Sequence, residues 1–211
     1  LFPYTTLFRS TQIVAALRQF ARRAKNVRLE RRTASSGQVT GLVRRGEATL
    51  GLRYFASDAA ELVSLAAGEE RMLVVAEPGH RLAGRRLRDP QALAGERWIG
   101  FPPVRGERDS SGHVLARQLT RAGLDAEAII MIDSLTAQKR LAQAGFGLAL
   151  VPESSVRDEL RRGDLVTLDV PALRTVIPIS VSHRRSGYLS PAAMTLLALL
   201  TGAMPARKAR V

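Results

Sequence analysis

Two short stretches of the sequence place hydroxyl side chains where a helix is predicted to begin. Ser35, Ser36 and Gly37 precede one apolar helical pattern, and Ser134, Leu135 and Thr136 precede another. The first N–H groups of a helix lack partners within it and carry a partial positive charge. With serine hydroxyls beside them, such groups bind small anions such as carboxylates. Each serine is equally suited to a plain capping role, and the two roles are compatible.

A third candidate for anion binding is Arg53, which ends the strand pattern that starts at Leu50. Its guanidinium group could bind a carboxylate through two parallel hydrogen bonds. The competing interpretation is a solvated surface residue, because arginine is abundant throughout the chain. Both interpretations stay open at the level of sequence.

Residues suited to catalysis or metal binding do not gather in the sequence. His80, His113 and His183 fall in separate segments without metal-ligand spacing, and cysteine is absent. Glu69 and Glu70 are adjacent, so on a strand they point to opposite faces and form no carboxylate pair. No nucleophile elbow, phosphate-binding loop or dinucleotide-binding motif follows any predicted strand. We therefore expect no catalytic residue, no metal and no cofactor.

Length and composition indicate a globular chain. The 211 residues, 45% of them hydrophobic, suffice for one ordinary core or two small ones, and no apolar run approaches the about 20 residues of a membrane span. The lack of cysteine fits a reducing compartment, and we expect a cytoplasmic protein without membrane contact.

The net charge of +13 points to an acidic partner such as nucleic acid. The basic residues, of which only Lys25, Lys139 and Lys208 are lysines, nevertheless spread over every predicted helix. Aromatic stacking residues and a recognition helix are also missing, so direct nucleic-acid binding by this sequence is not expected.

Helical and strand patterns alternate along the chain, in two successive sets. Helices are predicted over residues 13–24, from 35 to the stop at Gly46, over 110–122, 134–144 and 155–162, and after 190–191. Strands are predicted over 27–32, 50–55, 72–76, 98–101, 128–132, 148–151, 165–170 and 176–182, and residues 62–65 form a separate short segment before the run 72–76. This alternation favours an α/β fold with parallel sheets covered by helices. Residues 148–151, apolar throughout, are predicted to form an interior parallel strand. After the second set of elements, the last strand and helix are predicted to return to the first set. This implies two Rossmann-like lobes, a hinge where the chain crosses twice between them, and a cleft.

The pattern divides the chain into a leader, two lobes and a tail. Residues 1–10, LFPYTTLFRS, lack the period of the later segments and are expected to be a non-native leader outside the fold. Lobe I is predicted to comprise residues 11–84 plus 174–203, lobe II residues 85–173, and residues 204–211 a basic tail.

Five motifs in order carry a resemblance to a known family. They are the amphipathic helix through Phe20, TASS leading to LVRRGEATLGLR (33–53), LVVAEPGHRLA (73–83), AQAGFGLALVP (142–152) and LSPA (189–192). Over residues 11 to 203 the chain resembles the effector-binding, or substrate-binding, domain of LysR-type transcriptional regulators. The resemblance implies a periplasmic-binding-protein-like fold (type 2), a cleft for a small effector, dimers or tetramers, and DNA binding through an N-terminal winged helix-turn-helix that this sequence lacks.

The resemblance also implies roles for particular segments. Phe101, Pro102 and Pro103 correspond to a wall of the effector cleft, with an ordinary loop as the alternative. Residues Val39 to Arg45 and Ser110 to Ala122 are the candidates for self-association. The first strand of the family's domain would occupy the place of residues 1–10, whose role is left open.

Three functions remain to be distinguished. The leading hypothesis is a non-catalytic domain that senses a small carboxylate or other small anion, oligomerises, and regulates transcription through the absent DNA-binding domain. The alternative is a solute-binding receptor of a transporter, which shares the fold and requires export. An enzyme on the same scaffold would need a catalytic constellation, and the sequence shows none. The upstream reading frame would separate the first two, because one needs a helix-turn-helix and the other a signal peptide.

Overall fold

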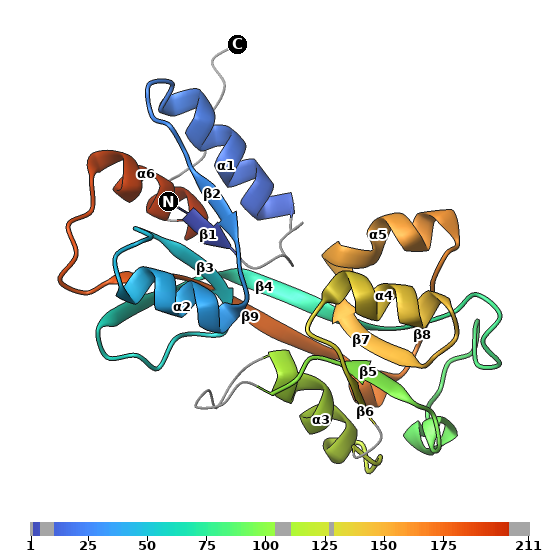
Figure 1. Ribbon diagram of the computed structural model, residues 1–211. Coiled ribbons are helices and arrows are strands. Elements are labelled where there is room, and N and C mark those ends of the chain that lie inside the picture. The colour runs from blue at the N-terminus through green and yellow to red at the C-terminus, as the bar shows by residue number, and fades with distance from the viewer. Residues whose placement is uncertain (1, 5–10, 104–110, 127–128, 203–211) are drawn as a thin grey trace. The chain divides into compact units, whose positions relative to one another are not determined.

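The computed structural model describes residues 2–4, 11–103, 111–126 and 129–202, which fold as two units (Figure 1). Unit 1 comprises residues 1–69 and 178–211, and unit 2 comprises residues 70–177. The chain crosses between them twice, in β4 (Leu62–Ala76) and in β9 (Thr175–Arg184). The expected boundaries near 84 and 174 differ from these, because the second half of β4 pairs with strands of unit 2.

The described part of unit 1 contains four paired strands and the first half of β4, and its helices α1 and α6 pack against each other. The strand order is β2 (Arg31–Thr33), β1 (Phe2–Tyr4), β3 (Gly51–Tyr54) and β9, and the helices are α1 (Thr11–Arg23), α2 (Ser36–Arg44) and α6 (Pro191–Leu200). β1 runs parallel to β2 and β3, whereas β9 is antiparallel to β3. Unit 1 is therefore a parallel α/β unit with one antiparallel strand, β9.

The segment expected to be a leader supplies part of this sheet. Phe2–Tyr4 lie between β2 and β3, with Phe2 opposite Arg31 and Tyr4 opposite Leu52. Excluding residues 1–10 from the fold was therefore wrong for residues 2–4, which occupy the place of the first strand. A strand of three residues is too short to show a period, which is why the sequence pattern missed it. Residues 5–10 lie outside the described residues.

The apolar stripe of α2 fixes that helix on the sheet of unit 1. Val39, Leu42 and Val43 are buried with Ala34, Ala48 and Leu62. Gly51 on β3 makes the approach possible, because a Cβ there would lie 2.6 Å from Val39 Cγ1. The start of α2 is thus held close to the strand that carries Arg53.

Unit 2 places helices on both sides of its sheet, with α4 and α5 on one side and α3 on the other (Figure 1). Its elements are the second half of β4, β5 (Trp98–Gly100), α3 (Ser111–Arg121), β6 (Ile129–Met131), α4 (Leu135–Gln143), β7 (Leu148–Pro152), α5 (Glu153–Arg162) and β8 (Val166–Leu168), with 3-10 turns at Pro90–Leu93 and Pro171–Leu173. All five residues of β7 are buried, including the predicted run 148–151. β7 is parallel to β5 and antiparallel to β4, so only one of its two neighbours is parallel.

An ion pair between α4 and α5 holds the helix that bears Ser134. Lys139 Nζ bonds to Glu159 Oε1 and donates to the carbonyl oxygen of Ser155 at 2.9 Å. Both side chains are about 15% exposed, at 15% and 14%. Burial alone would raise the pKa of Glu159, but the hydrogen bond and charge of Lys139 outweigh it, so the pKa lies below its ordinary value.

We expect Lys139→Met to lower the free energy of unfolding at neutral pH by about 2 kcal/mol, between the values for exposed and fully buried pairs. Because the folded pKa of Glu159 is depressed, the pair stabilises the chain above the unfolded value near 4.5, and this contribution is lost as pH falls through the folded pKa. Urea unfolding from pH 7 to pH 3 measures both effects. The difference between parent and variant should shrink at the acidic end, and a constant difference would contradict the assignment.

Candidate functional site

In unit 1 the predicted serine cluster forms the start of α2. Ser35 is the N-cap: its Oγ accepts from the N–H of Gln38 at 3.3 Å, and Gln38 Oε1 accepts from the N–H of Ser35 at 2.9 Å. This reciprocal pair is a capping box. The N–H groups of Ser36 and Gly37 belong to the first turn, where a helix offers no internal partner. They are the donors that an anion would meet.

Arg53, on β3, is buried and is hydrogen-bonded to α2 at Thr40, one turn after Ser36. Its side chain is 2% exposed, so the interpretation as a solvated residue was wrong. Nη1 donates to Thr40 Oγ1 at 2.7 Å, and Nε donates to the carbonyl oxygen of Tyr54 at 3.2 Å. Thr40 Oγ1 in turn donates to the carbonyl oxygen of Ser36 at 3.2 Å. A chain of two hydrogen bonds therefore links a buried positive charge to the start of α2.

In unit 2 the predicted residues lie at the carboxyl ends of two neighbouring parallel strands. β5 and β6 are paired, and the N–H of Ile132 donates to the carbonyl oxygen of Gly100 at 2.9 Å. Phe101 therefore follows β5 at the same edge where the chain leaves β6 toward Ser134. Ligands of open α/β sheets bind at this edge.

Ser134 caps α4 as predicted, because its Oγ accepts from the N–H of Ala137 at 3.3 Å. Leu135 is buried, so it offers an anion only its backbone N–H, whereas Ser134 and Thr136 are exposed. Phe101 and Pro102 are half-buried and Pro103 is exposed. A direct role of these residues in effector binding stays a prediction.

Two polar residues next to the predicted ones escaped the sequence analysis. Thr40 lies one helical turn after Ser36, a spacing that could have suggested its back-bond. Gln138 is fully buried and donates through Nε2 to the carbonyl oxygen of Ile132 at 2.8 Å. Within the described part of the chain its Oε1 has no hydrogen-bond partner. The first turns of α4 thus hold a buried acceptor close to the exposed donors.

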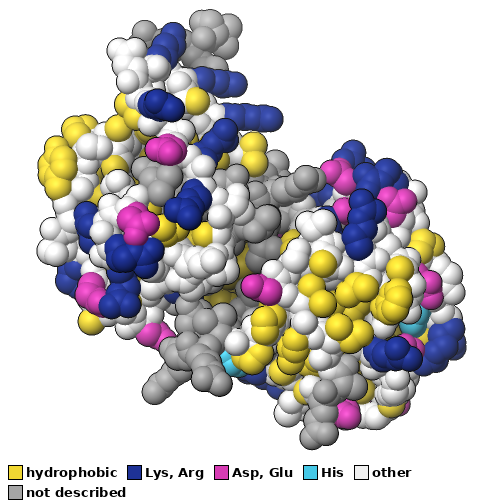
Figure 2. All heavy atoms as spheres, viewed as in Figure 1, with side chains coloured by type: hydrophobic (Ala, Val, Ile, Leu, Met, Phe, Trp, Pro, Cys, Tyr) yellow, Lys and Arg dark blue, Asp and Glu magenta, His cyan; other side chains and the backbone are white. Residues whose placement is uncertain are grey.

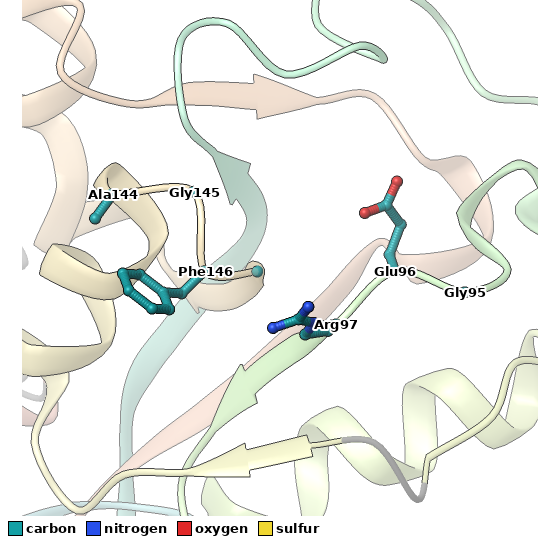
Figure 3. Close-up of a pocket in the computed structure, with 7 residues that line it drawn as sticks. Gly95, Glu96, Arg97, Ala144, Gly145 and Phe146 are labelled. Atoms are coloured by element: carbon teal, nitrogen blue, oxygen red, sulfur yellow. The ribbon is translucent and has the colours of Figure 1, made fainter.

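A pocket of about 360 Å³ lies elsewhere in unit 2 (Figure 3). Its lining consists of Gly95, Glu96, Arg97, Ala144, Gly145, Phe146 and Gly147. Glu96 accepts from Arg81 Nη2 at 2.7 Å, and Phe146 is 53% exposed. These segments precede β5 and β7, so the pocket is at the amino ends of the strands, whereas Phe101 and Ser134 follow carboxyl ends. None of the predicted effector-binding residues lines it.

Neither a metal site nor a membrane span was found in the described ranges. Those residues contain no group of three or more His, Cys, Asp or Glu side chains arranged to hold a metal ion. No helix among them has both the length and the apolar character needed to cross a membrane. His80 lies 3.5 Å from Glu96 through Nε2, in an ion-pair cluster with Arg81.

The chain matches one protein family and several known proteins. Residues 4–205 match the family described as LysR substrate binding domain. An uncharacterized HTH-type transcriptional regulator of Mycobacterium bovis is 29% identical over 140 residues, which are 66% of this chain and 45% of that protein. The chain therefore spans less than half the length of this relative.

Solved structures share the fold. The regulatory domain of CcmR from Synechocystis PCC6803, in complex with 2-PG, matches with a TM-score of 0.80 and 19% identity, covering 96% of this chain and 95% of that one. The effector binding domain of QuiR in complex with shikimate matches with a TM-score of 0.81 and 15% identity, covering 96% and 94%.

Proposed function

This chain belongs to the LysR substrate-binding domain family, and on that basis we propose that it senses a small anion on behalf of a larger transcriptional regulator. Its fold is the two-lobed α/β fold of type 2 periplasmic-binding proteins, as the sequence predicted. The match to regulators does not favour the alternative of a transporter receptor. The proposed role is non-catalytic and cytoplasmic.

The observation that carries the choice of an anion is the buried Arg53, which Thr40 links to the start of α2. A guanidinium charge shielded from water acts more strongly than one at the surface, because less solvent screens it. Its field adds to the partial positive charge of the first turn of α2. The capped start of α4, in unit 2, offers donors of the same kind, so a carboxylate is the favoured chemical group for either helix start. Shikimate, bound by the structurally similar QuiR domain, is itself a carboxylate.

The whole regulator would add DNA binding and oligomerisation to this sensor. Because this chain spans 45% of its mycobacterial relative, we assign the reading of DNA to an N-terminal winged helix-turn-helix outside these 211 residues. For self-association we propose the outer faces of α2 and α3, since Val39, Leu42 and Val43 on the inner face of α2 are buried in its own unit. Effector binding would bias the arrangement of the subunits through its differential affinity for their conformations.

A panel of small carboxylates that includes shikimate, titrated by calorimetry, tests the proposal. We expect Ser35→Ala and Ser134→Ala each to lower the free energy of unfolding by about 1 kcal/mol through the lost cap. If these hydroxyls also contact the anion, affinity should fall by a further about 1 to 3 kcal/mol. Ser36→Ala is the matched control for capping, because Ser36 is not the N-cap and its loss should affect binding alone.

Binding that is unchanged in all three variants, with lower stability only in the two cap variants, would show that the serines are caps and that the proposed site is wrong. Turnover of a bound compound, abolished by one of these changes, would contradict the non-catalytic role.

A further inference from the structure

The pocket of unit 2 presents charged groups of both signs next to an aromatic ring (Figure 3). Glu96 and Arg97 come from the segment before β5, and Phe146 comes from the turn that joins α4 to β7. Figure 3 shows the Arg97 guanidinium directed toward the side of the pocket where Phe146 lies, whereas the Glu96 carboxylate points in another direction. The pocket therefore has a positive, a negative and an apolar part.

The positive part is the Arg97 side chain, which is exposed. Within the described ranges it forms neither an ion pair nor a hydrogen bond, although the adjacent Glu96 pairs with Arg81. Its backbone is held in place, because its carbonyl oxygen accepts from the N–H of Leu148 at 2.8 Å. A guanidinium group with free N–H donors binds a carboxylate through two parallel hydrogen bonds.

The negative part is the Glu96 carboxylate, which is 17% exposed. Oε1 accepts from Arg81 Nη2 at 2.7 Å, whereas Oε2 lies 3.5 Å from His80 Nε2. A carboxylate accepts about four hydrogen bonds, so Oε2 keeps capacity for another donor. Ala144, which also lines the pocket, is the C-cap of α4, and the last carbonyl groups of a helix carry a partial negative charge. An ammonium group matches this part of the pocket.

The apolar part is the ring of Phe146, which is 53% exposed. The N–H of Phe146 donates to the carbonyl oxygen of Leu141 at 3.0 Å, so the residue is fixed at the end of α4. A ligand that covers the ring removes apolar surface from water. The volume of about 360 Å³ is near the lower end of the range for ligand pockets, which indicates a small molecule.

The surroundings of the pocket favour neither sign of charge. Unit 2 contains sixteen Lys and Arg residues and fourteen Asp and Glu residues, a net formal charge of +2. Figure 2 shows dark-blue and magenta side chains close together over parts of unit 2. Because the general field of the unit is weak, the charges that line the pocket decide which ligand it selects. Those charges are one carboxylate and one guanidinium.

We propose that this pocket binds a free α-amino acid with an apolar side chain. Arg97 holds its carboxylate, Glu96 and the end of α4 hold its ammonium group, and its side chain covers Phe146. A ligand with a single charge is less favoured, because either Glu96 repels its carboxylate or Arg97 repels its ammonium group. A peptide fits less well, since its two charged groups lie at opposite ends. The inference goes beyond the proposed function and does not depend on it, because no residue of the proposed anion site lines this pocket.

Calorimetric titration with L-leucine and L-phenylalanine tests the proposal. Two analogues of leucine, 4-methylpentanoate without the ammonium group and 3-methylbutylamine without the carboxylate, should each bind at least about tenfold more weakly than leucine. Arg97→Gln should weaken amino-acid binding by at least about tenfold, and Phe146→Ala by about threefold or more. The matched control is Arg88→Gln, which removes the same charge from another exposed position of unit 2 and should change the affinity by less than about twofold.

The proposal is overturned if neither amino acid binds at up to about 10 mM, or if 4-methylpentanoate binds as tightly as leucine. Equal effects of Arg97→Gln and Arg88→Gln would overturn it as well, since the pocket would then not hold the carboxylate. Repeating the titrations in the Arg53→Leu background separates the two proposals, because that change acts on the anion site of unit 1. Amino-acid binding that persists there belongs to the pocket, and binding that disappears there removes this inference and leaves the anion site in place.

Discussion

Replacing Arg53 by leucine should weaken carboxylate binding by about ten- to a hundredfold, while leaving the fold intact. The loss corresponds to about 1.4 to 2.7 kcal/mol and reflects the field of a buried charge that little solvent screens. Folding should suffer less, because removing a buried charge also removes its desolvation cost. Thr40 keeps its bond to the carbonyl oxygen of Ser36, so the first turn of α2 remains tied together. Calorimetric titration and urea unfolding of the same variant measure the two quantities.

Two further variants make this prediction specific. Arg44→Leu removes the same charge from an exposed position of α2, where the arginine pairs with Glu61. Its effect on binding should stay within about twofold, since exposed charges are screened. Arg53→Lys keeps the charge and should retain part of the affinity. If Arg44→Leu and Arg53→Leu weaken binding alike, or neither does, the buried guanidinium does not contribute to an anion site.

The features that the sequence predicted correctly are those that depend on residues close together in the chain. The caps at Ser35 and Ser134 formed as expected, and Ser190 likewise caps the helix predicted after 190–191, because a cap depends on residues within one helical turn. The apolar run 148–151 became a buried strand for a similar reason, since four consecutive apolar residues must be covered on both faces.

Contacts between distant parts of the chain could not be predicted in the same way. The burial of Arg53 depends on α2 lying over β3, and its partner Thr40 is thirteen residues away. On one side β7 pairs with the antiparallel β4. β4 is one strand of fifteen residues, whereas the sequence suggested a short segment at 62–65 and a separate strand at 72–76. The two units meet within this strand, after Glu69, and not near residue 84 as predicted. The sequence did not reveal one continuous strand because the alternation of apolar and polar residues is weak at Ala66, Ala67 and Gly68.

Glu70, the first residue of unit 2, illustrates the longest of these contacts. The sequence correctly set Glu69 and Glu70 on opposite sides of a strand, since Glu69 is exposed and Glu70 is 5% exposed. The buried carboxylate reaches the start of α5: Oε2 accepts from Ser154 Oγ at 2.8 Å and Oε1 accepts from the N–H of Ser154 at 3.2 Å. Nothing within eighty residues along the chain signals this pairing.

The Glu70 carboxylate caps α5, which has no side-chain cap of its own. The N-cap position is held by Pro152, which has no side-chain acceptor, and the helix begins at Glu153, two residues before the predicted start at Ser155. A negative charge at a helix N-terminus is stabilising, and here it is supplied by a strand 84 residues away. β4 and α5 are thereby joined where the chain enters unit 2.

Glu70→Ala should therefore lower the free energy of unfolding by about 3 kcal/mol, because two buried donors of Ser154 lose their acceptor at about 1 to 3 kcal/mol each. Glu70→Gln keeps one acceptor oxygen and should cost about 1 kcal/mol. The neighbouring Glu69→Ala, on the exposed side of the same strand, is the matched control and should stay within about 0.5 kcal/mol of the parent. Urea unfolding monitored by circular dichroism gives all three values. If Glu70→Ala were as stable as Glu69→Ala, the carboxylate would not cap α5, and the start of that helix would have to be stabilised from within its own first turn.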